Sequence, residues 1–253
     1  MRRLDKSTFL LILLVTLAFT CAAIAVRPLL FRIDKQREIN RELKEFDNTV
    51  TEAQQEVEKE AEQVPETEKK EEIVPYPELY ADILRYNLHL FNSKQADLNS
   101  KSAYEISSFR LTDYGLPDET FGVITIPKIE VEMPLYLGAS EQNMANGAAV
   151  LSQTSIPIGG LDTNAVIAGH RGYSGYKYFK DIDQLEIGDE VIIRNLWREI
   201  HYKVVDIQIV LPNGVEAILI QPGKELVTLL TCHPYASGGK YRYLVFCERI
   251  KDS

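Results

Sequence analysis

The chain has 253 residues, of which 45% are hydrophobic, and it carries a formal net charge of −9. This length is enough for one well-packed domain. The acidic balance argues against a nucleic-acid-binding protein, because such proteins gather Lys and Arg on one surface to displace counterions from phosphate. The three cysteines form neither a disulfide framework nor a pair spaced for a metal or redox site. The sequence indicates neither a metal nor another cofactor.

The chain begins with a basic tail and an apolar segment. Residues 1–6 include three basic residues, and residues 7–26 carry no charge. Twenty helical residues span about 30 Å, the thickness of a bilayer's hydrocarbon core. We therefore expect a cytoplasmic tail at 1–6 and a single transmembrane helix at 7–26 in the cell membrane. The positive-inside rule places the rest of the chain outside the cytoplasm, although basic residues after the span weaken this orientation.

Two other interpretations of the apolar segment also place the domain outside. Ala23-Ile24-Ala25 matches a signal-peptide cleavage site, but the apolar run is longer than the ~7–15 residues usual for signal peptides. A lipoprotein site at Cys21 is disfavoured because Phe19 and Thr20 precede it.

Residues 27–75 are predicted to form an acidic stalk. Within them, residues 34–75 hold 14 Asp or Glu and 7 Lys or Arg, which accounts for −7 of the total charge. The apolar residues are sparse: Ile39, Leu43, Phe46, Val50 and Val57. We expect a partly helical or disordered, solvated segment. A coiled coil is disfavoured, because these positions do not hold a heptad over three or four repeats.

Residues 76–253 are predicted to form the folded domain. It opens with an amphipathic helix over 78–93, in which apolar residues from Leu79 to Leu90 recur at helical spacing. Short runs rich in Val, Ile and Tyr follow, separated by Gly and Asn. No long helical segment separates these runs, so the pattern favours a mainly β, mainly antiparallel barrel or sandwich.

Two predicted strands end on a reactive side chain. NAVIAGH ends at His170 and ELVTLLTC ends at Cys232. A free cysteine at pH 7 is only a few per cent thiolate, so its use as a nucleophile needs a proton acceptor such as histidine. By spacing alone, a buried core cysteine and a turn histidine are the more usual explanation of these residues.

The motifs around these residues resemble those of a known family. TLLTC at 228–232, GHRG at 169–172 and the arginine at 242 resemble the signature of sortases. The longer blocks ITIPKIEVEMPLYLGAS, SIPIGGLDTNAVIAGHRG, FKDIDQLEIGDEVII and TLLTCHPY resemble class C sortases, the pilin polymerases of Gram-positive cell surfaces. The resemblance covers roughly Tyr80 to Arg249. It implies a closed eight-stranded β-barrel with short helices.

The resemblance also implies a reaction and its residues. Cys232 would cleave an LPxTG-like sorting signal through a thioester, and His170 would serve as acid and base. Arg242 would steady the reacting carbonyl. The acceptor would be a lysine of another pilin subunit, so pilin subunits are the expected partners. The sequence does not indicate an oligomeric state.

Other residues compete for these roles. Arg171 is a rival guanidinium that we expect to point elsewhere, and Arg249 lies too far along its strand. His233 is adjacent to Cys232, so their side chains project to opposite sides of an extended chain. Cys247 has the opposite strand parity to Arg242, which predicts a free, buried thiol rather than a disulfide with Cys232.

The sequence departs from class C sortases in two ways. It contains no Asp-Pro dipeptide, whereas class C enzymes commonly carry an Asp-Pro-aromatic lid over the active site. We therefore expect an open site, or one that is covered differently. Residues 251–253 follow the last predicted strand directly, so anchoring is expected to rest on the N-terminal helix alone.

Two other functions remain open at this point. A wall-anchoring sortase would use the same first step and a peptidoglycan-precursor amine as acceptor. A non-catalytic surface scaffold would keep only the barrel.

Overall fold

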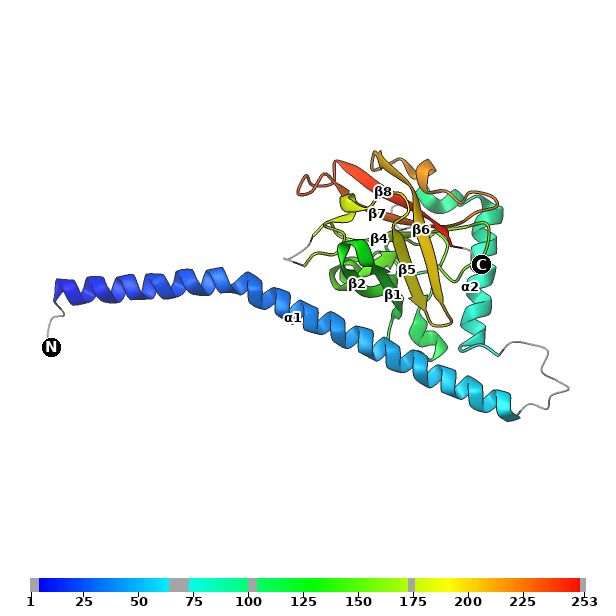
Figure 1. Cartoon of the computed structure of the whole chain (residues 1–253), viewed down its shortest axis with the longest axis horizontal. Helices are drawn as coiled ribbons and strands as arrows, with labels where there is room; N and C mark the ends of the chain where they lie inside the picture. The colour runs from blue at the N-terminus through cyan, green and yellow to red at the C-terminus, as the bar shows by residue number, and fades with distance from the viewer. Residues whose placement is uncertain (1–4, 64–72, 100–103, 173–175, 251–253) are drawn as a thin grey trace.

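The computed structural model describes residues 5–63, 73–99, 104–172 and 176–250. Eight strands form a closed barrel in the order β1-β2-β3-β4-β7-β8-β6-β5 (Figure 1). The strands are β1 Thr120–Ile126, β2 Val131–Leu137, β3 Ala148–Val150, β4 Thr163–Ala168, β5 Glu190–Asn195, β6 Glu199–Val210, β7 Glu225–His233 and β8 Tyr241–Arg249. This confirms the closed eight-stranded barrel that the resemblance to sortases implies. Closure also leaves the sheet without an exposed edge.

The helices differ greatly in length. The α-helices are α1 Lys6–Gln63, α2 Pro77–Ser93 and α3 Glu141–Asn146. Short 3₁₀ helices are η1 Ala96–Asn99, η3 Leu111–Tyr114, η4 Pro127–Ile129, η5 Ile182–Gln184 and η6 Val215–Ile218. The amphipathic helix predicted over 78–93 is confirmed as α2, which buries Leu79, Ile83 and Leu90.

Two of the barrel's strand pairs are parallel, β2 with β3 and β4 with β7, and the remaining pairs are antiparallel. The β4–β7 pair joins residues 163–168 to residues 225–230, far apart in the sequence. Because the two strands run in the same direction, their carboxyl ends meet at one end of the barrel. That end carries both predicted reactive residues.

The barrel wall packs against two separate apolar clusters. The larger cluster fills the interior and includes Val227 and Leu229 from β7 and Val245 from β8. The smaller cluster covers the outside of β4, β7 and β8 and includes Val166 and Leu244. Side chains alternate along a strand, so successive residues of β7 belong to different clusters. This alternation decides which residues can face a substrate.

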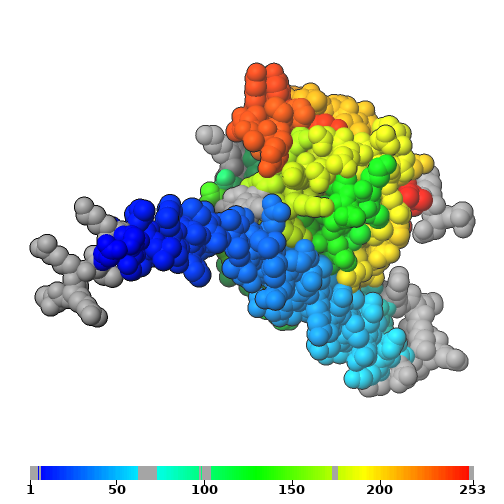
Figure 2. Space-filling model, turned by 60° about the vertical axis from the view of Figure 1, so that its left-hand side comes forward, coloured from blue at the N-terminus to red at the C-terminus, as the bar shows by residue number. Residues whose placement is uncertain are grey.

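The structure corrects the expected stalk. Residues 27–63 continue α1 as helix, and Ile39 and Phe46 are 0% and 2% exposed. Phe46 belongs to the larger cluster, which extends from the barrel interior to the outer surface under the helices, and Leu43 and Val50 also pack against this cluster. The stalk is therefore a helix docked on the barrel rather than a solvated segment (Figure 2). Residues 1–4 and 64–72, to which the expected tail and stalk extend, lie outside the described residues.

The reason is an apolar stripe along α1. Its members follow at alternating steps of four and three residues, as in a heptad repeat. They are Ile39, Leu43, Phe46, Val50, Ala53 and Val57. Including Ala53 completes the repeat that the sparse pattern lacked, and the partner of this stripe is the barrel rather than a second helix. The complete burial of Ile39 and Phe46 contributes about 1.5–3 kcal/mol each.

Polar contacts fix the register of α1 on the barrel. Tyr136 of β2 donates a hydrogen bond to Glu42 at 2.5 Å, and Arg194 of β5 pairs with Asp47 at 2.6 Å. Burial raises the pKa of Glu42. The N-terminal part of α1 extends beyond the barrel (Figure 1) and contains a stretch long and apolar enough to cross a membrane, none of which is buried.

Candidate active site

The parallel β4–β7 pair brings His170 and Cys232 to the same end of the barrel. Ala168 pairs with Leu230, and the ladder continues because the Gly169 amide donates to the Leu230 carbonyl at 3.1 Å. His170 follows Ala168 by two residues, and Cys232 follows Leu230 by two residues, so His170 and Cys232 lie at the same level of the barrel. The arrangement is secured by the Thr231 hydroxyl, which donates to the Gly169 carbonyl at 2.6 Å.

Strand alternation places Cys232 on the outer face of the wall. Val227 and Leu229 of β7 point into the larger cluster, so Leu230 and Cys232 have the outward parity. Cys232 is exposed. In β4, Val166 and Ala168 belong to the outer cluster, and His170 follows Ala168 by two residues, just past the end of the strand.

Arg242 lies opposite Cys232 on the neighbouring strand. The two residues are direct partners in the antiparallel β7–β8 ladder. Arg242 donates from Nη1 to the Gly239 carbonyl at 2.8 Å and to the Tyr241 carbonyl at 3.2 Å. A Cβ at Gly239 would lie 3.0 Å from Arg242 Nη1 and 3.2 Å from Cys232 Sγ, so one backbone position touches both groups.

The backbone around His170 is held on a second side. The Phe179 amide donates to the His170 carbonyl at 3.0 Å, and the His170 and Tyr178 rings meet edge to face at 6.1 Å. A Cβ at Gly169 would lie 2.5 Å from the Phe179 ring, which explains the glycine before the histidine. Burial lowers the pKa of His170, which favours the neutral imidazole needed to accept a proton.

The other thiols differ from Cys232. Cys247 is fully buried with inward parity on β8, and no disulfide joins it to Cys232. Burial raises the pKa of the Cys247 thiol. The free, buried Cys247 that the sequence predicts is confirmed, and it is unsuited to nucleophilic attack.

The competing basic residues have other partners or lie away from Cys232. Arg171 is buried and pairs with Asp183 at 2.5 Å and with His233 Nδ1 at 2.7 Å. Arg249 pairs in the β-ladder with Tyr202, at the other end of β8 from Arg242. His201 lies between Glu190 and Glu199, which raise its pKa, and His89 is exposed on α2.

Two cavities flank the catalytic end. An apolar cavity of about 200 Å³ lies beside Arg242, lined by Leu230 and Leu244 and by the segment between β6 and β7. A more polar cavity of about 510 Å³ lies on the His170 side, lined by Gly172, Tyr178 and Tyr235 and by Arg32 of α1.

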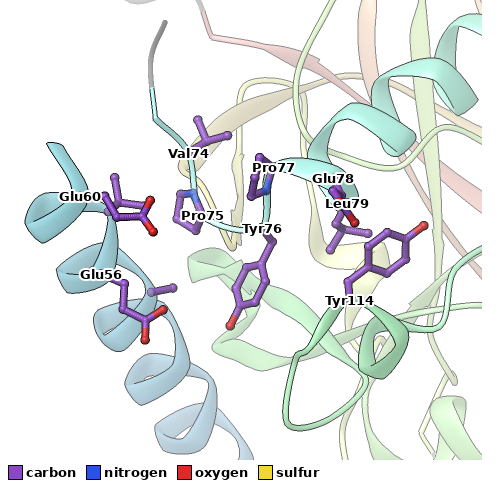
Figure 3. A pocket seen from close by; sticks show the side chains of 11 residues that line it. Glu56, Glu60, Val74, Pro75, Tyr76, Pro77, Glu78, Leu79 and Tyr114 are labelled. Atoms are coloured by element: carbon purple, nitrogen blue, oxygen red, sulfur yellow. The ribbon is translucent and has the colours of Figure 1, made fainter. Parts of the chain in front are cut away.

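A third cavity belongs to another part of the molecule. It measures about 340 Å³ and lies between α1 and the entry to α2 (Figure 3). Glu56 and Glu60 face Pro75 and Tyr76 across it, and none of the candidate active-site residues lines it. No group of three or more potential metal ligands occurs in the parts of the chain that the structure describes.

Sequence reasoning missed three contributors to this end of the barrel. Thr231 and Gly239 hold the backbone beside the reactive groups, and Arg171 joins two loops. The GHRG and TLLTC motifs contain Thr231 and Arg171, but their contacts depend on the pairing of β4 with β7. Gly238-Gly239 is visible only as a turn signal.

Comparison with known proteins agrees with this arrangement. A model of the Sortase domain matches residues 124–250. Sortase A of Bacillus anthracis is 30% identical over 127 residues, which cover 50% of this chain and 58% of that protein.

Two solved structures extend the likeness to most of the chain. Sortase C1 of GBS pilus island 1 has a TM-score of 0.67 at 26% identity, covering 85% of this chain and 99% of that one. Sortase C of Streptococcus pneumoniae has a TM-score of 0.58 at 29% identity, covering 84% and 97%.

Proposed function

The chain belongs to the sortase family of cysteine transpeptidases, and we propose that it joins pilin subunits through an LPxTG-like sorting signal. Cys232 is the nucleophile, His170 the acid and base, and Arg242 the stabiliser of the reacting carbonyl. The observation that supports this assignment is the strand pairing, β4 with β7 and β7 with β8, that brings the three residues to one end of the barrel.

The first half-reaction forms a thioester. Cys232 attacks the carbonyl carbon of the Thr residue while its thiol proton passes to His170. The C–N bond then breaks, and the imidazolium returns the proton to the leaving amine. Arg242 donates to the oxygen that gains negative charge, a role worth about 3–4 kcal/mol for a comparable donor.

The second half-reaction runs through the same groups in reverse. An incoming amine attacks the thioester carbonyl and loses a proton to His170. The C–S bond breaks, and the proton returns to the Cys232 sulfur. The product is an amide, and the enzyme is regenerated without a cofactor.

The apolar cavity beside Arg242 suits the Leu and Pro of the sorting signal. It begins at Leu230, which shares the outward face with Cys232, and continues to the segment between β6 and β7. Apolar side chains that precede the scissile bond would gain burial there without placing a charge in the cavity.

A pilin lysine is the acceptor that the relatives favour. Two structures that cover more than 80% of this chain are a sortase C1 named for a pilus island and a pneumococcal sortase C. We therefore assign the chain to the assembly of covalent surface pili on a Gram-positive cell. A peptidoglycan-precursor amine is the alternative acceptor.

We propose that α1 anchors the enzyme in the cell membrane as a single span, with the barrel outside the cytoplasm. Arg2, Arg3 and Lys6 precede the apolar stretch, in agreement with the positive-inside rule. Arg32 lines the cavity on the His170 side and lies about 9 Å along the helix beyond Val26. The catalytic end then faces substrates that are themselves held at the membrane.

Incubation of the enzyme with a pilin that bears a sorting signal tests the proposal. We expect covalent ladders on denaturing gels and, by mass spectrometry, an isopeptide bond to the side-chain amine of a pilin lysine. Cys232→Ala is the matched control and should give none. Cleavage with transfer to a wall-precursor amine, and no ladder, would favour the wall-anchoring alternative, and a Cys232→Ala protein with full cellular effect would favour a scaffold.

A further inference from the structure

A polar cluster centred on the buried Arg171 lies at the catalytic end, and its member His233 has the opposite strand parity to Cys232. We propose that Arg171, His233 and Asp183 act as positioning residues, which set the separation and orientation of His170 relative to Cys232. This inference rests on the proposed function, since it concerns the same His170–Cys232 pair.

The cluster links the two residues that follow the reactive ones. Arg171 follows His170, and His233 follows Cys232, and their side chains meet at 2.7 Å between Nη1 and Nδ1. Arg171 Nη2 also pairs with Asp183 Oδ2 at 2.5 Å, which brings in η5 as a third element. One guanidinium thus connects the segments after β4, within β7 and in η5.

The packing around the guanidinium restricts its position. The Arg171 side chain is 5% exposed, and its Cζ lies 5.6 Å from the centre of the Tyr243 ring. The His233 ring lies 5.4 Å from the same Tyr243 ring. Arg171 Nε is buried without a hydrogen-bond partner among the described residues. Leaving a buried donor unpaired costs about 1–3 kcal/mol. Because Nε makes no hydrogen bond among the described residues, the contacts of Nη1 and Nη2 determine the orientation of the Arg171 guanidinium.

The contact also defines the state of His233. A guanidinium only donates, so His233 Nδ1 must accept, and the ring is neutral with its proton on Nε2. For the contact with Arg171, the position of the accepting atom at residue 233 therefore matters more than the imidazole ring itself. Asparagine places an amide oxygen near the position of Nδ1, which makes it the conservative substitute.

Contacts before and after the reactive pair therefore hold the two chain segments together. Before the pair, Gly169 is bonded to Leu230 and Thr231. After the pair, Arg171 is bonded to His233. His170 and Cys232 lie between these two sets of contacts. Loss of the Arg171–His233 contact leaves the Gly169 contacts intact, and the two chain segments can then separate at the level of the reactive pair.

Kinetics of peptide cleavage test this role. His233→Ala should lower kcat about 10-fold or more with KM changed less than twofold, because a displacement of 1 Å costs up to about 100-fold. His233→Asn should recover kcat to within about threefold, because its amide oxygen accepts from Arg171. Wild-type kcat in His233→Ala, or an equal loss in the two variants at equal melting temperatures, would overturn the proposal.

A second measurement does not depend on the substrate. The rate of alkylation of Cys232 by iodoacetamide, followed against pH, reports the coupling of the thiol to His170. The profile of His233→Ala should approach that of His170→Ala, and the profile of His233→Asn should match the wild type. If the wild type cleaves no sorting peptide, the proposed function fails, and this alkylation series still decides the positioning role.

A third variant covers a folding failure of His233→Ala. Asp183 is half exposed, so Asp183→Ala removes one contact of Arg171 with little change in packing. We expect a loss of about 3-fold to 10-fold in kcat at unchanged KM. This loss is smaller than for His233→Ala, because the contact between Arg171 and His233 remains. An unchanged kcat with a normal fold would contradict the proposal.

Discussion

The two faces of the barrel wall at the ends of β4, β7 and β8 carry different chemistry. The outward face presents His170, Cys232 and Arg242 beside two cavities. The inward face holds polar groups that are paired with one another, Arg171 with His233 and Asp183. Cys232 is followed on β7 by His233, which points to the other face because side chains alternate, and His170, just past the end of β4, is followed by Arg171. The comparison teaches that reactivity here depends on the face as well as on the residue type.

The two barrel cysteines give the largest expected contrast. Cys232→Ala should reduce peptide cleavage at least about 10³-fold, because the outward thiol is the proposed nucleophile. Cys247→Ala should leave the rate unchanged and lower the free energy of unfolding by about 1–2 kcal/mol, because the inward thiol only fills the core. Cleavage assays and denaturant unfolding measure the two effects. Loss of cleavage in both variants at equal folding would break the distinction.

The two arginines of β8 give the next contrast. Arg242→Ala should lower kcat about 10²-fold to 10³-fold, and Arg242→Lys should recover only part of this loss, because a point charge replaces a planar fork. Arg249→Ala, at the other end of the strand, is the matched control and should keep kcat. A wild-type rate in Arg242→Ala would remove that residue from the mechanism.

The glycine pair between β7 and β8 sharpens the comparison further. Gly239→Ala should lower kcat about 10-fold, because its Cβ would lie 3.0 Å from Arg242 Nη1 and 3.2 Å from Cys232 Sγ. Gly238→Ala shares the positive φ but meets nothing within 4 Å, so it controls for backbone strain. Equal losses in the two variants would show that strain alone matters.

The smallest expected effect concerns pH. Burial lowers the pKa of His170 from its ordinary value of 6.5, because the imidazolium loses hydration. The neutral imidazole then persists to lower pH, so the acid limb of kcat/KM should lie below pH 6.5. A pH profile of peptide cleavage measures this limb. An acid limb above pH 6.5 would contradict a half-buried, neutral His170.

Much of the barrel could be predicted from short-range pattern. Alternating Val, Ile and Tyr runs with Gly-containing turns predicted a mainly β domain, and parity alone predicted that Cys247 faces away from Arg242. The α2 helix followed from apolar spacing. These features are local, since each depends on residues within one strand or one helix.

The docking of α1 could not be predicted in the same way. Its charged surface indicated a solvated stalk, and its apolar stripe was incomplete without Ala53. Alanine is a weak hydrophobic signal in sequence, yet at 7% exposure it lies where the helix meets the barrel. A partner surface was needed to show that the stripe has somewhere to pack.

By itself, the sequence indicated which side chains are candidates for the reaction and which face of a strand Cys232 and Cys247 occupy, because the period of a β-strand is two residues. Only the tertiary structure decided that β4 pairs with β7 in parallel, which brings position 170 to the level of position 232. It also decided that Arg171 meets His233 behind them. Strand pairing is a long-range choice made by the burial of whole faces, and no local pattern in either strand contains it.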